Sequence, residues 1–131
     1  MTKTVPEKGS AFGALLTDEQ HARLLKNGQE NAERIAEDGD TKDFWPVVKL
    51  FCPWGAATWL LSEIDPEAPD IAFGLCDLGM GSPELGSVSL AEIAALRGPA
   101  GLTIEQDRHF KATKSLTAYA GEAREEGRIC A

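Results

Sequence analysis

The residues best suited to acid–base chemistry or cation binding lie in the second half of the chain: Asp77, Glu84, Asp107 and His109. Carboxylates and imidazole can transfer protons and bind cations, so we take these four as candidate catalytic residues. Asp77, Asp107 and His109 would converge if the segment 102–107 paired beside the segment 71–76. No group of residues in the sequence has the spacing of a known catalytic motif, so we assign no catalytic residue, and these four remain candidates only.

No metal or cofactor motif accompanies these candidates. His21 and His109 lie in different regions, and neither has a second ligand at the His-x-x-x-His or Glu-x-x-His spacing. The glycine-rich stretch 77–86, DLGMGSPELG, lacks the Gly-Lys-Ser/Thr ending of a phosphate loop and the spacing of a dinucleotide site. We interpret its glycines as turn residues with positive φ between a strand and a helix. We therefore expect no metal and no cofactor.

The cysteines and the apolar patterning bear on compartment. Cys52, Cys76 and Cys130 form no Cys-x-x-Cys pair, and an odd number of separated cysteines suits a reducing environment. Cys76 precedes Asp77, whose carboxylate would raise the pKa of the thiol and oppose activation. No apolar run approaches the roughly 18 residues of a membrane span, and we recognise no secretory signal. We expect a cytoplasmic protein that does not enter a membrane.

The charge of the chain limits its partners. The formal net charge is −8 and 43% of the residues are hydrophobic, which allows one domain with a continuous core. Direct binding to a nucleic acid needs clustered Lys and Arg, so we do not expect it. An acidic surface instead fits a partner with a basic surface.

Acidic side chains gather in two segments. The segment 63–70 contains four carboxylates: Glu63, Asp65, Glu67 and Asp70. Pro66 and Pro69 stiffen this turn, which lacks the central glycine of a calcium loop. With the segment 37–43, EDGDTKD, it would present a negative patch to a basic groove, a form of nucleic-acid mimicry. Two solvated loops are the alternative interpretation.

The three tryptophans lie close together in the sequence. Trp59 belongs to an alternating apolar stretch and is predicted to lie in the core. Trp45 and Trp54 flank turns, where a partly exposed indole often forms the centre of a protein contact. We therefore add Trp45 and Trp54 to the four carboxylates as candidate partner-binding residues.

The elements that must position these residues follow from local patterns. Thr17 and Gln20 form a capping box, after which Leu24, Leu25, Gly28, Ala32 and Ile35 share one helical face, with a break at residues 27–28 left open. Strands are predicted at 45–52, 56–64, 71–76 and 101–107, with a further short strand before a helix near 90–97. Short connections favour an antiparallel meander. A last helix spans 115–127.

Together these elements predict an α+β fold. It has an antiparallel sheet of about four to five strands, an N-terminal helix, a helix near 90–97 and a C-terminal helix. Residues 1–13 are predicted to form a flexible lead-in to a single domain at 14–131.

Several runs of the sequence resemble a known family. They include LLTDEQHARLLKNG, TWLLSEIDP, AFGLCDLGMGSPELG and SLAEI. On these runs the chain, from residue 15 to about 120, resembles a bacterial family called domain of unknown function 2958. The resemblance implies an accessory protein of plasmids and other mobile elements. It implies no activity, so no catalytic residue carries over.

Two classes of function follow. The first is a small acidic mobile-element protein that acts by protein–protein interaction, one form being inhibition of a host restriction or CRISPR nucleoprotein complex. Its partner would be a host protein or nucleoprotein complex with a basic surface. The alternatives are a small enzyme with an Asp/Glu/His site, or a regulatory module that acts within a protein complex.

Overall fold

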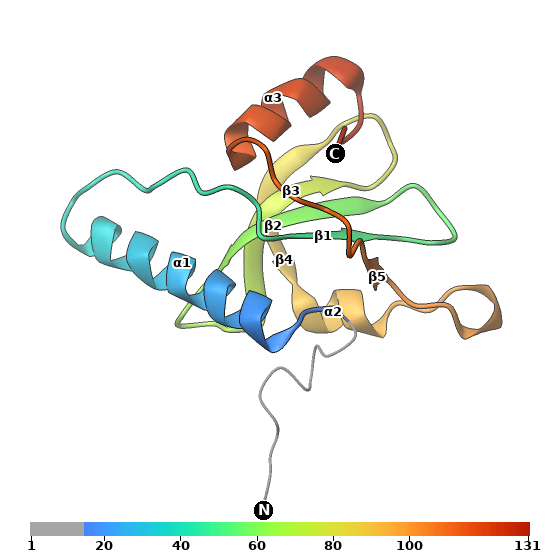
Figure 1. Cartoon of the computed structure of the whole chain (residues 1–131), viewed down its shortest axis with the longest axis horizontal. Helices are drawn as coiled ribbons and strands as arrows, with labels where there is room; N and C mark the ends of the chain where they lie inside the picture. Colours follow the sequence, from blue (N-terminus) through green and yellow to red (C-terminus); the bar gives the residue numbers. More distant parts are fainter. Residues whose placement is uncertain (1–14) are drawn as a thin grey trace, which may run out of the picture.

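Five antiparallel strands form one sheet with helices on both faces, as the computed structural model shows for residues 15–131 (Figure 1). In chain order the elements are α1 (Asp18–Ala36), β1 (Val48–Phe51), β2 (Thr58–Ile64), β3 (Ile71–Asp77), β4 (Glu84–Ser89), α2 (Leu90–Ala95), the short 3₁₀ helix η3 (Pro99–Gly101), β5 (Glu105–Gln106) and α3 (Leu116–Glu126). The predicted α+β class, with its N-terminal and C-terminal helices, is confirmed. The lead-in predicted at 1–13 lies outside the described residues.

The first four strands form a meander. Each pair of consecutive strands is antiparallel, and the sheet order is β4-β3-β2-β1-β5. The connections between these strands are too short for a parallel crossover, which needs a dozen or more residues. Leu61, Gly74 and Gly86 face one another across β2, β3 and β4.

The glycine-rich stretch is the turn between β3 and β4 rather than a passage from strand to helix. Gly79 and Gly81 have φ values of 82° and 83°, so their predicted positive φ is confirmed. The stretch continues into β4, and only then does α2 begin, with Ser89 accepting a hydrogen bond from the backbone N–H of Glu92. The predicted short strand is therefore β4, six residues long.

The segment 101–107 pairs beside β1 and not beside β3. Only Glu105 and Gln106 form a strand, and the backbone N–H of Asp107 donates to the carbonyl oxygen of Lys49 at 2.9 Å. The physical reason is that β3 already has β2 on one side and β4 on the other, whereas the outer edge of β1 is open.

Helix α1 is continuous through residues 27–28. It starts at the predicted capping box, in which Thr17 and Gln20 exchange side-chain-to-backbone hydrogen bonds. Gly28 lies inside the helix and does not end it. The residue faces the backbone of β2, and a Cβ at this position would lie 1.7 Å from the carbonyl oxygen of Ile64. The glycine thus allows close helix–sheet packing.

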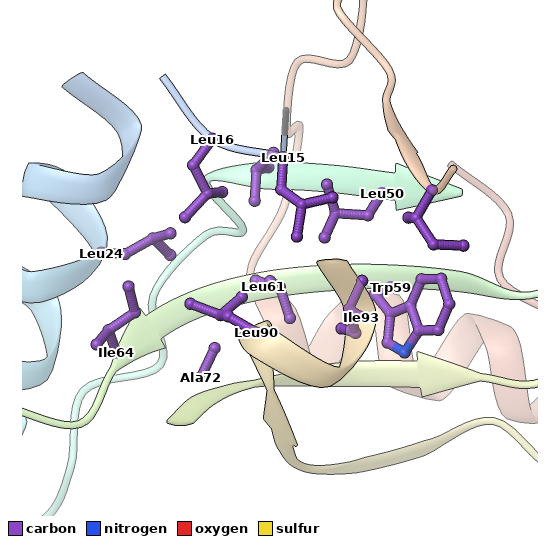
Figure 2. Close-up of a cluster of buried hydrophobic side chains, with 12 residues drawn as sticks. Leu15, Leu16, Leu24, Leu50, Trp59, Leu61, Ile64, Ala72, Leu90 and Ile93 are labelled. Carbon is purple, nitrogen blue, oxygen red and sulfur yellow. The ribbon is translucent and has the colours of Figure 1, made fainter. Parts of the chain in front are cut away.

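The core consists of two apolar clusters, one on each face of the sheet. Leu60 and Leu61 belong to different clusters because successive side chains of β2 point to opposite faces. The larger cluster joins the sheet to α1 and α2 and includes Leu24, Leu50, Trp59, Leu61, Ile64 and Leu90 (Figure 2). The smaller cluster joins it to α3 and includes Leu60, Leu75, Leu116, Tyr119 and Ala123. The predicted core position of Trp59 is confirmed.

Candidate functional site

The four candidate catalytic residues do not converge in the structure. Asp77 ends β3 and Glu84 begins β4, while Asp107 and His109 follow β5 at the opposite edge of the sheet. Strands β2 and β1 lie between the two pairs. Within residues 15–131, no group of three or more His, Cys, Asp or Glu side chains has the arrangement of a metal site.

Asp77 is held by backbone donors. Its side chain is buried, with the residue only 3% exposed. Oδ1 accepts a hydrogen bond from the N–H of Gly79 at 2.8 Å, and Oδ2 accepts one from the N–H of Ile129 at 3.0 Å. The carboxylate therefore joins the β3–β4 turn to the segment that follows α3. This arrangement assigns Asp77 a structural role.

Asp107 also has local partners. Its Oδ1 accepts a hydrogen bond from the N–H of His109 at 2.9 Å, and its Oδ2 lies 3.5 Å from the Nζ of Lys49. His109 and Glu84 are exposed.

The three cysteines are free, and burial raises the pKa of the Cys76 thiol. Burial, rather than the neighbouring carboxylate, thus opposes thiolate formation at Cys76.

The four carboxylates of the segment 63–70 divide into two inner and two outer groups. Asp70 accepts hydrogen bonds from the Ser89 hydroxyl at 2.6 Å and from the N–H of Ala91 at 2.8 Å, so it stabilises the start of α2. Glu63 is half-buried and accepts a hydrogen bond from Asn31. Asp65 and Glu67 are exposed in the β2–β3 turn. Only these last two have solvent-facing carboxylates on the turn itself.

The exposed acidic turn borders an apolar depression at the C-terminal end of α1. This depression, of about 230 Å³, is lined by residues of α1, β2, β3, β4 and the β2–β3 turn, including Ala32, Ile35, Glu63, Asp65, Ile71 and Phe73. Ile35 is 61% exposed and Phe73 is 37% exposed. Ile35 continues the apolar face of α1 beyond the part that the sheet covers. We call these residues the α1-end depression.

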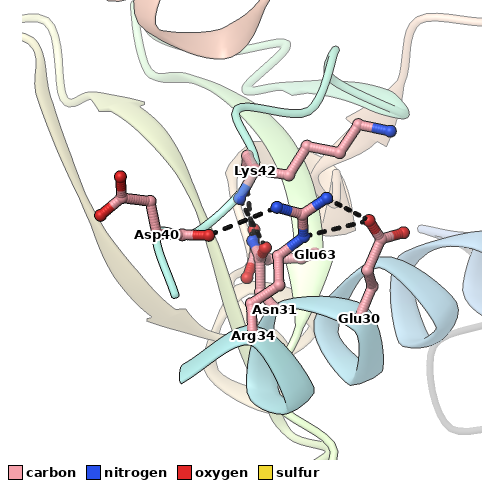
Figure 3. Close-up of polar contacts among 6 residues, drawn as sticks. All are labelled: Glu30, Asn31, Arg34, Asp40, Lys42 and Glu63. Atoms are coloured by element: carbon pink, nitrogen blue, oxygen red, sulfur yellow. Dashed lines mark hydrogen bonds and ion pairs between the residues drawn. The ribbon is translucent and has the colours of Figure 1, made fainter. Parts of the chain in front are cut away.

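A polar network fixes the acidic segment 37–43 beside α1 (Figure 3). The Asn31 carboxamide accepts from the N–H of Lys42 at 2.7 Å and donates to its carbonyl oxygen at 3.2 Å. Arg34 lies 3.2 Å from the Glu30 carboxylate and donates to the carbonyl oxygen of Asp40. The feature of the sequence that could have indicated this network is a pair of asparagines, at 27 and 31, which lie one turn apart on the inward side of α1. The carboxylates at 37, 38 and 40 are exposed and lie immediately after the C-terminal end of α1.

Glu63 provides a test of this network through its pKa. Burial raises the pKa of Glu63 above its ordinary value of 4.5, and the hydrogen bond from Asn31 lowers it in part. Because the pKa of Glu63 is higher in the folded state than in the unfolded state, the protonated carboxyl favours folding. This contribution to the free energy of unfolding is present below about pH 4.5 and is lost as the pH rises through the folded-state pKa. We expect Glu63→Gln to raise the free energy of unfolding at pH 7 by on the order of 0.5 kcal/mol, since solvent screens a half-buried group.

The measurement is urea denaturation of both chains at pH 7 and pH 4. The difference between them should become smaller at pH 4, because the pKa of Glu63 lies above 4 in the folded state and most of the carboxyl is then protonated. Asp65→Asn, at an exposed position, serves as the control and should give no comparable gain at pH 7. A Glu63→Gln chain less stable than the parent at pH 7 would contradict the assigned cost of ionising Glu63.

The two candidate tryptophans have different surroundings. Trp54 is half-buried and packs on Gly98, where a Cβ would lie 2.3 Å from the indole ring. Trp45 is 55% exposed and lies on the connection between α1 and β1. It lines a groove of about 880 Å³ between the N-terminal half of α1, the segment 42–47 and the segment 110–112. We call this the Trp45 groove, and sequence reasoning did not identify it.

The segment 42–47 is attached to α3 as well as to α1. The Asp43 carboxylate accepts hydrogen bonds from the N–H of Thr117, at 3.2 Å, and from its hydroxyl. Burial alone would raise the pKa of Asp43, but the hydrogen bonds from Thr117 and Ser115 outweigh it and lower the pKa. The Phe44 carbonyl oxygen accepts from the N–H of Leu116. Trp45 therefore projects from a segment whose backbone is held on both sides.

These observations define a small acidic α+β protein whose main surface features are an acidic-rimmed apolar depression and a groove with an exposed indole. The chain belongs to the family described as protein of unknown function (DUF2958), whose model matches residues 15–130. No curated protein and no solved structure matches the chain. None of the helices described for residues 15–131 combines the length and apolar character that crossing a bilayer requires.

Proposed function

We propose that this protein acts by binding another protein, or a nucleoprotein complex, that has a basic surface. The observation that carries the proposal is the α1-end depression. Two exposed apolar side chains, Ile35 and Phe73, lie in one hollow, and exposed carboxylates lie beside it on the turn after β2. Apolar side chains at the centre with polar groups around them are the usual composition of a protein interface.

The two parts of this surface have different effects on binding. Burial of Ile35 and Phe73 against a partner removes apolar area from water and supplies affinity. The carboxylates of Asp65 and Glu67, with the net charge of −8, attract a basic partner and raise the association rate at low salt. The surface therefore fits a partner that offers an apolar pocket or ridge surrounded by Lys and Arg.

The finer form of the proposal concerns biological context. The family resemblance implies accessory proteins of bacterial plasmids and other mobile elements, which act in the cytoplasm of the host. A host restriction or CRISPR complex has basic grooves that bind nucleic acid, and an acidic surface of this kind competes for such a groove. We therefore propose inhibition of a host defence complex as the function. The exposed carboxylates of Asp65 and Glu67 would then mimic a phosphate backbone.

The experiment is a quantitative affinity purification from a bacterial host that carries the native mobile element, followed by binding kinetics with the recovered partner. Ile35→Ser and the double variant Asp65→Lys/Glu67→Lys are each expected to weaken binding by about tenfold or more. Leu102→Ser and Glu125→Lys/Glu126→Lys are matched controls, because they change exposed residues away from the depression. Equal affinity of the depression variants and the controls would refute the proposed surface.

A further inference from the structure

The Trp45 groove has a charge opposite to that of the whole protein. Three of its lining side chains are cationic, Arg23, Lys42 and Lys111, and two are acidic, Glu19 and Asp43. The Asp43 carboxylate is already engaged by Thr117. Within residues 15–131, Arg23 and Lys111 have no ion-pair partner. They lie on α1 and on the segment 110–112, so cations reach the groove from two sides. The groove therefore favours an anionic group.

Asn27 gives the groove an unsatisfied hydrogen-bond acceptor. It is only 8% exposed and is the most buried polar side chain among the lining residues. Its Nδ2 donates to the carbonyl oxygen of Ser62 at 2.9 Å, which fixes the carboxamide. Its Oδ1 has no donor within the described part of the chain. Buried polar atoms are nearly always paired, so a ligand N–H at Oδ1 would complete the site.

Apolar and aromatic side chains supply the remaining part of the lining. The Trp45 indole is more than half exposed, and Phe110 is half-buried in the segment opposite α1. An exposed indole provides a flat surface on which a ring can stack, and cations nearby strengthen such stacking sites. The volume of about 880 Å³ is within the range of small-molecule sites.

We propose that the Trp45 groove binds a nucleoside monophosphate. This ligand class combines a flat heterocycle for Trp45, ring or exocyclic N–H donors for Asn27, and a phosphate for Arg23 and Lys111. A compact ligand fits better than a long polyanion for an electrostatic reason. Within about 8 Å, the Debye length at physiological salt, the cations of the groove dominate. A nucleic acid or an acidic polypeptide would extend past the groove and be repelled by the charge of −8. This site is separate from the α1-end depression.

The test is a titration of the full chain with each of the four common ribonucleoside monophosphates, with the matching nucleosides and with inorganic phosphate. A short oligonucleotide and an acidic peptide are titrated in the same way as larger anions. Calorimetry gives the affinity, and the NMR signal of the Trp45 indole N–H reports the site. We expect at least one monophosphate to bind with a Kd below about 1 mM and to shift the Trp45 signal. Its affinity should exceed that of its nucleoside and that of phosphate by at least about tenfold, because the ring and the anion bind together.

Variants locate the site. Trp45→Ala and the double variant Arg23→Ala/Lys111→Ala should each weaken binding of that monophosphate by at least about tenfold, while Lys26→Ala, an exposed position of α1 outside the groove, should not. Unchanged melting temperatures exclude misfolding. The proposal is overturned if no monophosphate shifts the Trp45 signal, if phosphate alone binds equally well, if the groove variants bind as the parent does, or if a short oligonucleotide or acidic peptide binds more tightly. None of these results affects the proposed protein partner.

Discussion

Replacing Gly28 with alanine is expected to lower the free energy of unfolding by about 3 kcal/mol, among the largest losses for a single substitution in this chain. The new Cβ would lie 1.7 Å from the carbonyl oxygen of Ile64 and 2.8 Å from its carbonyl carbon. These atoms belong to the backbone of β2, where Ile64 is paired with Ala72 of β3, so a displacement of Ile64 would disturb the β2–β3 ladder. Helix α1 would have to move away from the sheet, and Leu24 would lose part of its packing.

Gly121→Ala is the matched control because Gly121 also lies inside a helix, α3, but has no neighbour within 4 Å of the position of a Cβ. Alanine is a better helix former than glycine, so this change is expected to stabilise the chain by up to about 1 kcal/mol. Urea denaturation of the two variants measures both effects. A Gly28→Ala chain as stable as the parent would show that α1 does not pack this closely on β2.

Replacing Asp77 with alanine is expected to lower the free energy of unfolding by about 3 kcal/mol as well. The change leaves the buried backbone N–H of Ile129 without an acceptor, which costs about 1–3 kcal/mol, and it also removes the hydrogen bond to the N–H of the exposed residue Gly79. The segment after α3 would lose its attachment to β3. Faster amide hydrogen exchange at Gly79 and Ile129 should accompany the loss.

Asp77→Asn separates a structural carboxylate from a chemical one. Asparagine keeps one acceptor and places a donor opposite the other N–H, so its stability should lie between those of the parent and of Asp77→Ala. Asp65→Ala, at an exposed carboxylate of the β2–β3 turn, is the control and should lose much less. An Asp77→Ala chain with full stability would contradict the structural role and return Asp77 to the catalytic candidates.

Local patterns predicted most of the secondary structure. The capping box at Thr17 places the start of α1, and Ser115 places the start of α3, because a cap satisfies backbone donors within three residues of itself. Short connections between apolar stretches required an antiparallel meander. Trp59 was placed in the core for the same kind of reason, since alternation along a strand is a local property.

The two surface features, the α1-end depression and the Trp45 groove, depend on contacts that no local pattern records. From the sequence, Glu63, Asp65, Glu67 and Asp70 were interpreted as one acidic group. In the structure, Glu63 accepts a hydrogen bond from Asn31 and Asp70 accepts one from Ser89, and both donors are distant in the chain. Likewise the Trp45 groove combines α1 with segments near residues 45 and 111. Its most buried polar group, Asn27, is ordinary in the sequence and becomes distinctive only through its burial.

The sequence by itself determined the helices, the order of the strands along the chain, the net charge and the family. Tertiary structure alone decided that β5 pairs with β1, so that β2 and β1 lie between the strand of Asp77 and the strand that precedes His109. The physical reason is that caps, alternation and short turns act within a few residues. Strand-edge pairing and the burial of a side chain depend instead on which surfaces the rest of the fold leaves open.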